Sequence, residues 1–129
     1  MKNYESVDRD PLTGKVIACA IAVHREMGPG LLESTYEHCL AAELSLHNIP
    51  FERQLVLPVE YRGIVIACAY RVDFMIDDRL IIELKAVSAI HDLHRAQILA
   101  YMKLSNVDTG LLINFNAIQL KQGIQRFRL

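Results

Sequence analysis

Apolar side chains at helical spacing dominate the first third of the chain. Residues 1–9 are polar and we expect them to form a flexible arm, whereas Asp10-Pro11 predicts a helix start because proline is tolerated in the first turn. Apolar residues then recur every three or four positions until Gly28-Pro29-Gly30 ends the helix. A second helix is expected over residues 31–47, ended by Asn48-Ile49-Pro50.

A strand pattern follows these helices. Residues 51–61 and 64–76 are rich in β-branched and aromatic side chains and are separated by the turn signal Arg62-Gly63. Further strands are expected over residues 80–87 and 110–114, with a helix over residues 89–104 between them and a last strand within residues 119–129. The order α, α, β, β, β, α, β predicts a mixed sheet flanked by helices.

The composition narrows the class of protein without identifying a function. A chain of 129 residues with 52% hydrophobic side chains suits one domain, so we expect residues 10–129 to form a single domain. No secretory signal is visible, and the longest apolar run is far shorter than the roughly 20 residues of a membrane span. We therefore expect a soluble, cytoplasmic protein with no membrane partner. Cys19, Cys39 and Cys68 form no CxxC pair, so we expect buried, inert thiols.

Basic and acidic side chains nearly balance, with 14 Lys and Arg against 15 Asp and Glu. Proteins that attract nucleic acid through their overall field carry net positive charge, so any such partner must be attracted locally here. Lys121, Arg126 and Arg128 form one local basic group near the C-terminus.

The residues with the clearest chemical content flank a turn at residues 77–79. Glu83 and Lys85 are two positions apart on a strand, so their side chains leave the same face. Asp73 lies on the preceding strand. A three-residue turn would put Asp73 directly opposite Glu83, whereas a two-residue turn would put Glu83 on the other face. A converging site therefore requires the three-residue turn.

This group of charges has two interpretations. Charged residues that alternate with apolar ones are typical of a half-exposed strand with surface salt bridges. Alternatively, two carboxylates suit Mg²⁺ or Mn²⁺, which prefer oxygen ligands and keep several waters. Such an ion would acidify a bound water and neutralise charge on a phosphate, and a nearby lysine would position that water or stabilise the transition state.

Two helices place further polar side chains on stripes that should face inward. Gln97 and Tyr101 are four residues apart at the centre of such a stripe, and buried polar groups need partners that a polar site would supply. Glu33 lies within about 20° of the apolar centre of the second helix, with Glu37 as a rival for the same role. Satisfied core side chains, or a glutamate that complements the helix dipole, are the alternatives.

The segment Gly30-Leu31-Leu32-Glu33-Ser34-Thr35-Tyr36 fits the signature of the small bacterial GxxExxY protein family, which resembles a compact branch of the PD-(D/E)XK nuclease superfamily. The resemblance runs from about Leu12 to the C-terminus and includes Gly110-Leu111-Leu112-Ile113-Asn114-Phe115. It implies a restriction-endonuclease-like α-β-β-β-α-β core, with a mixed four-stranded sheet flanked by helices, plus an extra N-terminal helix and C-terminal strand. Val72 stands where the superfamily pattern has proline.

The same resemblance implies roles for individual residues. Asp73 and Glu83 would hold Mg²⁺, or Mn²⁺, together with the backbone carbonyl of Leu84. Lys85 would be the catalytic lysine, and Glu33 would be the acidic residue from the first core helix.

Gln97 and Tyr101 are similar to a QxxxY motif that supports such a site or contacts nucleic acid. The expected function is hydrolysis of phosphodiester bonds in DNA. The alternative is a catalytically silent nuclease-fold module that acts in nucleic-acid or protein binding and assembly. Because a domain this small offers little surface for a duplex, a homodimer that builds its groove from two subunits is a further hypothesis.

Overall fold

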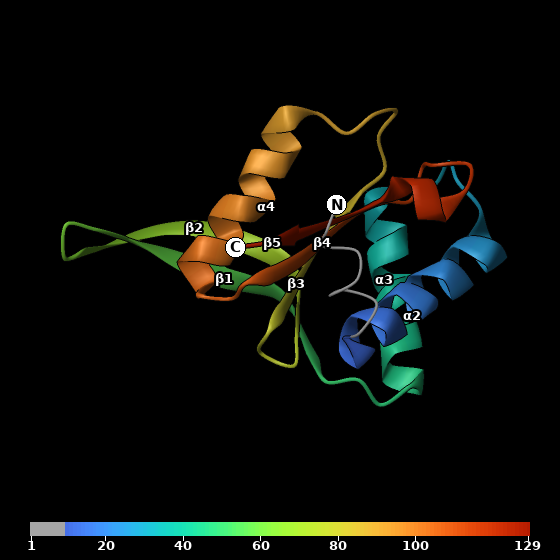
Figure 1. The fold of residues 1–129 in the computed structure, drawn as a ribbon, viewed down its shortest axis with the longest axis horizontal. Coiled ribbons are helices and arrows are strands. Elements are labelled where there is room, and N and C mark those ends of the chain that lie inside the picture. The colour runs from blue at the N-terminus through green and yellow to red at the C-terminus, as the bar shows by residue number, and fades with distance from the viewer. Residues whose placement is uncertain (1–9) are drawn as a thin grey trace.

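The structure, a computed structural model, describes residues 10–129, so the arm expected over residues 1–9 lies outside the described residues (Figure 1). Helices α2 (Pro11–Met27) and α3 (Glu33–Leu46) precede the strands β1 (Phe51–Tyr61), β2 (Ile64–Ile76) and β3 (Leu80–Lys85). Helix α4 (Asp92–Ser105) then leads to β4 (Thr109–Asn114), the short 3₁₀ helix η1 (Leu120–Gly123) and β5 (Ile124–Arg128).

The described strands form one mixed five-stranded sheet in the order β1-β2-β3-β4-β5. β3 and β4 are parallel and are connected through α4, whereas the other neighbouring pairs are antiparallel. The expected α-β-β-β-α-β order is present, and so is the expected C-terminal strand, which is β5; the sheet has five strands rather than four because β5 joins it. β5 pairs with β4 along its whole length, from Thr109 opposite Arg128 to Ile113 opposite Ile124, and so extends the same sheet.

Several element ends differ from the sequence expectation by two or three residues. Helix α3 begins at Glu33 and α4 at Asp92, and residues 120–123 form η1 rather than strand. β3 ends at Lys85 because, beyond it, the Asn114 side chain takes the place of backbone hydrogen bonds between β3 and β4. The Val87 N–H donates to Asn114 Oδ1 at 3.1 Å, and Asn114 Nδ2 donates to the Val87 carbonyl at 2.9 Å.

Helices α2 and α3 cover one face of the sheet, as Figure 1 shows. Helix α2 starts at the predicted place because the Asp10 side chain accepts from the Leu12 N–H at 3.1 Å and Pro11 occupies the first turn. The buried faces of both helices pack against every second residue of the central strands. These residues are Phe74, Ile76, Leu80, Ile82, Leu84, Leu111 and Ile113. This layer is the larger of the two buried clusters.

Helix α4 covers the opposite face of the sheet (Figure 1). Its buried residues Ile98, Tyr101 and Met102 pack against the strand residues Met75, Ile81 and Leu112. Odd-numbered β3 residues therefore point toward α4, and Glu83 and Lys85 belong to that set. The fold thus places the candidate acidic residue and lysine beneath α4.

The turn before α3 is fixed by an aromatic side chain. Tyr36 is fully buried and stacks on Phe115, with ring centroids 4.6 Å apart. Its hydroxyl donates to the Gly28 carbonyl at 2.6 Å and accepts from the Leu31 N–H at 3.0 Å. Gly30 has a φ of 99°, which a glycine adopts without strain. The Gly30, Glu33 and Tyr36 pattern therefore has a structural cause, since the glycine and the tyrosine set where the first turn of α3 lies.

The cysteine expectation holds only in part. Cys19 is buried, but Cys39 is half-buried, and the side chain of Cys68 lies outside the described part of the structure. Cys39 sits at the margin of the α2–α3 layer rather than within it. Across residues 10–129, no helix has the length and apolar content that a transmembrane segment requires.

The close approach of β4 and η1 gives a test of the fold. A Cβ at Gly123 would lie 2.5 Å from the Asn114 carbonyl oxygen, so the backbone itself would have to move. We expect Gly123→Ala to lower the free energy of unfolding, measured by urea denaturation, by about 1–3 kcal/mol. Gly14→Ala is the matched control, because a Cβ there meets nothing within 4 Å and lies inside α2. It should raise stability by about 0.5–1 kcal/mol, and equal stabilities would contradict this packing.

Candidate active site

Asp73 and Glu83 face each other across the point where β2 and β3 separate. The strands pair from Ile76 opposite Leu80 to Phe74 opposite Ile82, which makes the predicted three-residue turn correct. Beyond this point the carboxylates of Asp73 and Glu83 accept the hydrogen bonds that backbone carbonyls accept in a regular ladder. The Asp73 N–H donates to Glu83 Oε2 at 2.8 Å, and the Leu84 N–H donates to Asp73 Oδ2 at 2.8 Å. The two carboxylates are therefore held by reciprocal bonds to each other's strands.

The carbonyl of Leu84 faces the same gap between the strands. In a β-strand, the N–H and C=O of one residue point to the same edge, as the paired bonds of an antiparallel ladder show. The Leu84 N–H points toward Asp73, so its carbonyl oxygen points the same way. One backbone oxygen and two carboxylates thus converge at this edge.

Lys85, Gln97 and Tyr101 border this gap from the side of α4. Gln97 Oε1 lies 3.5 Å from Lys85 Nζ, at the limit of a hydrogen bond. Tyr101 is 7% exposed, and Gln97 is its hydrogen-bond partner. The structure therefore brings the expected glutamine and tyrosine together with the lysine.

Glu33 and Glu37, the two rival residues of α3, occupy different environments. Glu33 is the first residue of α3 and is exposed rather than buried on the inward stripe, because the helix begins there. Its charge still interacts with Asp73 and Lys85. Glu37 is instead engaged by other side chains, since Arg53 Nη2 lies 3.2 Å from Glu37 Oε2. Glu33 is thus the α3 carboxylate that remains available at the rim of the site.

Burial and mutual repulsion raise the pKa values of three carboxyl groups at this site, those of Glu83, Asp73 and Glu33. Loss of hydration is the largest cause at Glu83, followed by the negative charge of Asp73, and together they raise its pKa to about 8. Loss of hydration also raises the pKa of Asp73, against the bonds from Leu84 and Gln54. The pKa of Glu33 is raised by desolvation and then by Asp73. The ionised forms of these three carboxyl groups are therefore disfavoured, and the positive charge of Lys85 does not fully offset that cost.

Gln54 joins this site although nothing in the sequence pattern singled it out. Its Nε2 donates to Asp73 Oδ1 at 3.2 Å and to Glu37 Oε1 at 2.9 Å. Its φ of 51° lies in the left-handed region, which is uncommon for glutamine. No local signal in the sequence predicts that conformation, because glutamine has no preference for it.

The donor set fits a hard divalent cation. Carboxylates and a backbone carbonyl are ligands that Mg²⁺ and Mn²⁺ prefer, and few protein ligands suffice because Mg²⁺ keeps several waters. Among residues 10–129, no group of three or more His, Cys, Asp or Glu side chains is arranged as a ready metal cage. Ionisation of buried Glu83 beside Asp73 is disfavoured, and a bound cation would offset that cost.

The sequence also matches a known family over most of its length. Residues 10–127 match the family model described as the PD-(D/E)XK nuclease superfamily. The chain belongs to the PD-(D/E)XK nuclease superfamily. No curated protein and no solved structure matches the chain. The expectation that Asp73 and Glu83-Leu84-Lys85 form the motif in the superfamily's name, with Val72 in place of its proline, stays a prediction.

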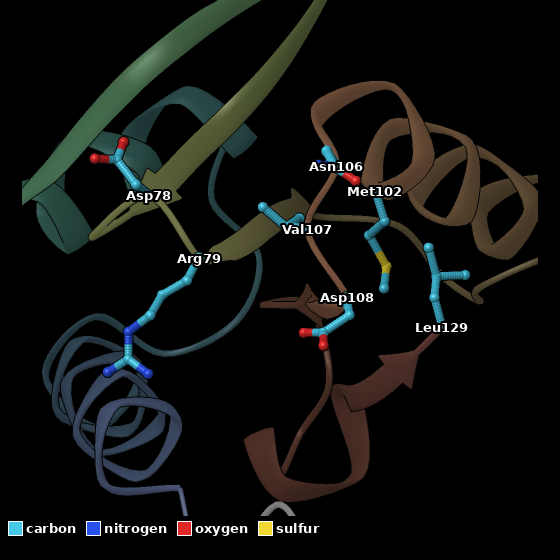
Figure 2. Close-up of a pocket in the computed structure, with 7 residues that line it drawn as sticks. All are labelled: Asp78, Arg79, Met102, Asn106, Val107, Asp108 and Leu129. Carbon is cyan, nitrogen blue, oxygen red and sulfur yellow. The ribbon is translucent and has the colours of Figure 1, made fainter.

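A pocket lies near the start of β3, at the opposite end of this strand from Lys85 (Figure 2). It is bordered by Asp78 and Arg79, which precede β3, and by Asp108, which precedes β4. Five residue steps along β3 separate Leu80, at this end, from Lys85, a distance of about 16.5 Å at 3.3 Å per residue. All three charged side chains are exposed, so this pocket has none of the buried polar groups that mark the candidate site.

The raised pKa of Glu83 predicts how stability depends on pH in the absence of divalent cations. Between about pH 4.5 and 8, folded Glu83 holds a proton that the unfolded chain has released. Stability should therefore fall as pH rises through this window, and the raised pKa values of Asp73 and Glu33 act in the same direction.

Glu83→Gln removes the titrating group at nearly constant shape. Thermal melts in EDTA between about pH 5 and 8 should show a smaller loss of stability for Glu83→Gln than for the wild type. Glu52→Gln, an exposed position on β1, is the control and should follow the wild type. Parallel curves for the wild type and Glu83→Gln would contradict the assignment of the raised pKa to Glu83.

Proposed function

We propose that this chain is a metal-dependent nuclease that hydrolyses phosphodiester bonds of DNA, and that it belongs to the GxxExxY branch of its superfamily. The observation that carries the proposal is the reciprocal pairing of Asp73 and Glu83 where β2 and β3 separate, with Lys85 on the same face as Glu83. The roles of Gly30 and Tyr36 in setting the first turn of α3 support the branch assignment.

In this proposal Mg²⁺, or Mn²⁺ in its place, is held by Asp73, Glu83 and the Leu84 carbonyl. Glu33 is the further acidic residue that α3 contributes at the rim of the site. The bound ion supplies charge neutralisation at the phosphate and a more acidic water. The carboxylates fix the ion's position because their own orientation is fixed by backbone N–H groups. A cation also favours the ionised form of Glu83, which burial alone disfavours.

Lys85 acts on the reacting groups in this proposal. Its ammonium donates a hydrogen bond to the attacking water or to the charge that develops on the phosphate oxygen. Gln97 orients the ammonium through its Oε1, and Tyr101 in turn holds Gln97. This arrangement supports a site-supporting role for Gln97 and Tyr101.

Cleavage assays with single-stranded, double-stranded and branched DNA, and with RNA of the same sequence, test the activity. We expect cleavage in Mg²⁺ or Mn²⁺ that Asp73→Asn and Lys85→Met each reduce by at least about 100-fold. Lys103→Met is the matched control, because Lys103 is exposed on α4 outside the site. Cleavage that survives unchanged in Asp73→Asn and Lys85→Met would point to a contaminant and reject the proposal, and cleavage confined to RNA would reject its DNA part.

Thermal stability in millimolar Mg²⁺ tests the cation site without an activity assay. Because the ion binds the folded state, a concentration ten times Kd should stabilise the protein by about 1.4 kcal/mol. Glu83→Gln should abolish the shift, whereas Glu52→Gln should retain it. The absence of any shift in the wild type would favour the silent nuclease-fold module over the enzyme.

A further inference from the structure

The hairpin of β1 and β2 changes layers at Gln54 and Asp73. Phe51 of β1 and Phe74 of β2 pack in the α2–α3 layer. Leu55 lies four residues after Phe51, and Val72 lies two residues before Phe74, so a regular strand would point them to the same face. Both instead pack in the α4 layer. The pairing register is the same on both sides of this point, with Arg53 opposite Phe74 and Leu55 opposite Val72. The change of layer therefore comes from a local twist and not from an inserted residue.

Gln54 has the backbone conformation that accounts for this twist. Neighbouring residues of a regular strand point to opposite faces. Here Arg53 and Gln54 are neighbours, yet both side chains bind Glu37, through Oε2 and Oε1 respectively. The left-handed φ of 51° at Gln54 turns its side chain toward α3 and Asp73. Strained conformations of this kind persist where the surrounding structure holds them, and they concentrate at functional sites.

The Gln54 amide is shared between two carboxylates. Its Nε2 carries two hydrogens, and acceptors lie at 2.9 Å on Glu37 and at 3.2 Å on Asp73. Asp73 Oδ2 is already bound by the Leu84 N–H, so the Gln54 bond to Oδ1 fixes the second oxygen of the same carboxylate. With both oxygens bound, the plane of the Asp73 carboxylate is determined.

We propose that Gln54 is a positioning residue that orients Asp73 for cation binding and keeps Glu37 on the α3 side, outside the ligand set. This inference rests on the proposed function, because it assigns Gln54 to the same cation site. Gln54 acts through Asp73 and contacts neither the cation nor the substrate. Outer partners of this kind contribute about 10–100-fold to metal affinity in other metal sites.

Gln54→Gly separates the side chain from the backbone strain. Glycine adopts a positive φ freely, so the melting temperature should stay equal to that of the wild type or rise. Mn²⁺ affinity, measured by calorimetry, should nevertheless fall about 10–100-fold, and kcat should fall more than KM rises. A purely structural role predicts the reverse, with lower stability and unchanged metal affinity per folded molecule.

Amide hydrogen exchange in EDTA gives a readout that needs no metal and no substrate. The Leu84 N–H is protected by Asp73 Oδ2, so a loosened Asp73 should speed its exchange relative to that of Leu112, a buried residue of β4. Gln54→Glu, which keeps the side-chain size but removes both donors, should speed it as well. This second variant tests the inference even if the glycine variant fails to fold.

Arg62→Gly is the matched control for the backbone change. Arg62 has a φ of 52° at the tip of the hairpin, far along the strands from Asp73, so this variant relieves a similar strain outside the site. It should leave both the Mn²⁺ affinity and the Leu84 exchange rate at wild-type values. Wild-type protein that binds no Mn²⁺ would overturn the proposed function, and the Leu84 exchange rates would still decide whether Gln54 positions Asp73. Unchanged Leu84 exchange in both Gln54 variants would overturn this inference.

Discussion

The exchange of hydrogen bonds between Asp73 and Glu83 is the interaction on which the site depends. The β2–β3 ladder stops at Phe74 and Ile82, and the next backbone N–H groups are satisfied by the two carboxylates instead. Backbone donors in a buried position need partners, so the strands can separate here only because each carries an acceptor for the other. The acidic residues therefore serve the fold and define the gap that a cation would enter.

The layers of the fold explain why polar side chains from five elements, α3, β1, β2, β3 and α4, reach this gap. Helix α3 covers one face of the sheet and α4 covers the other, and the hairpin of β1 and β2 passes from one layer to the other at Gln54 and Asp73. Side chains at that crossing can therefore contact residues of both α3 and α4. Asp73 can thus be linked to Glu37 of α3 through Gln54, while Lys85 meets Gln97 of α4.

The sequence predicted the parts of this arrangement that follow from periodicity and turn length. The three-residue turn and the shared face of Glu83 and Lys85 were correct because strand geometry fixes both. The exposure of Glu33 was missed, since the start of α3 depends on the Tyr36 hydroxyl and the preceding turn rather than on helical spacing. Gln54 was missed for a different reason. Its left-handed backbone is imposed by tertiary contacts, and no property of glutamine indicates it.

The near-neutral charge of the chain takes on a different meaning once the acids are located. A total of 15 acidic residues against 14 basic ones gives no overall field that would attract a polyanionic partner. Several of the acids, however, are gathered at one place, where burial and mutual repulsion raise the pKa of Glu33, Asp73 and Glu83. Protonation or a divalent cation removes that local negative charge. The field that a phosphate would meet at the site is therefore set by the occupancy of the carboxylate cluster and by Lys85, and the net charge of the chain is a poor guide to it.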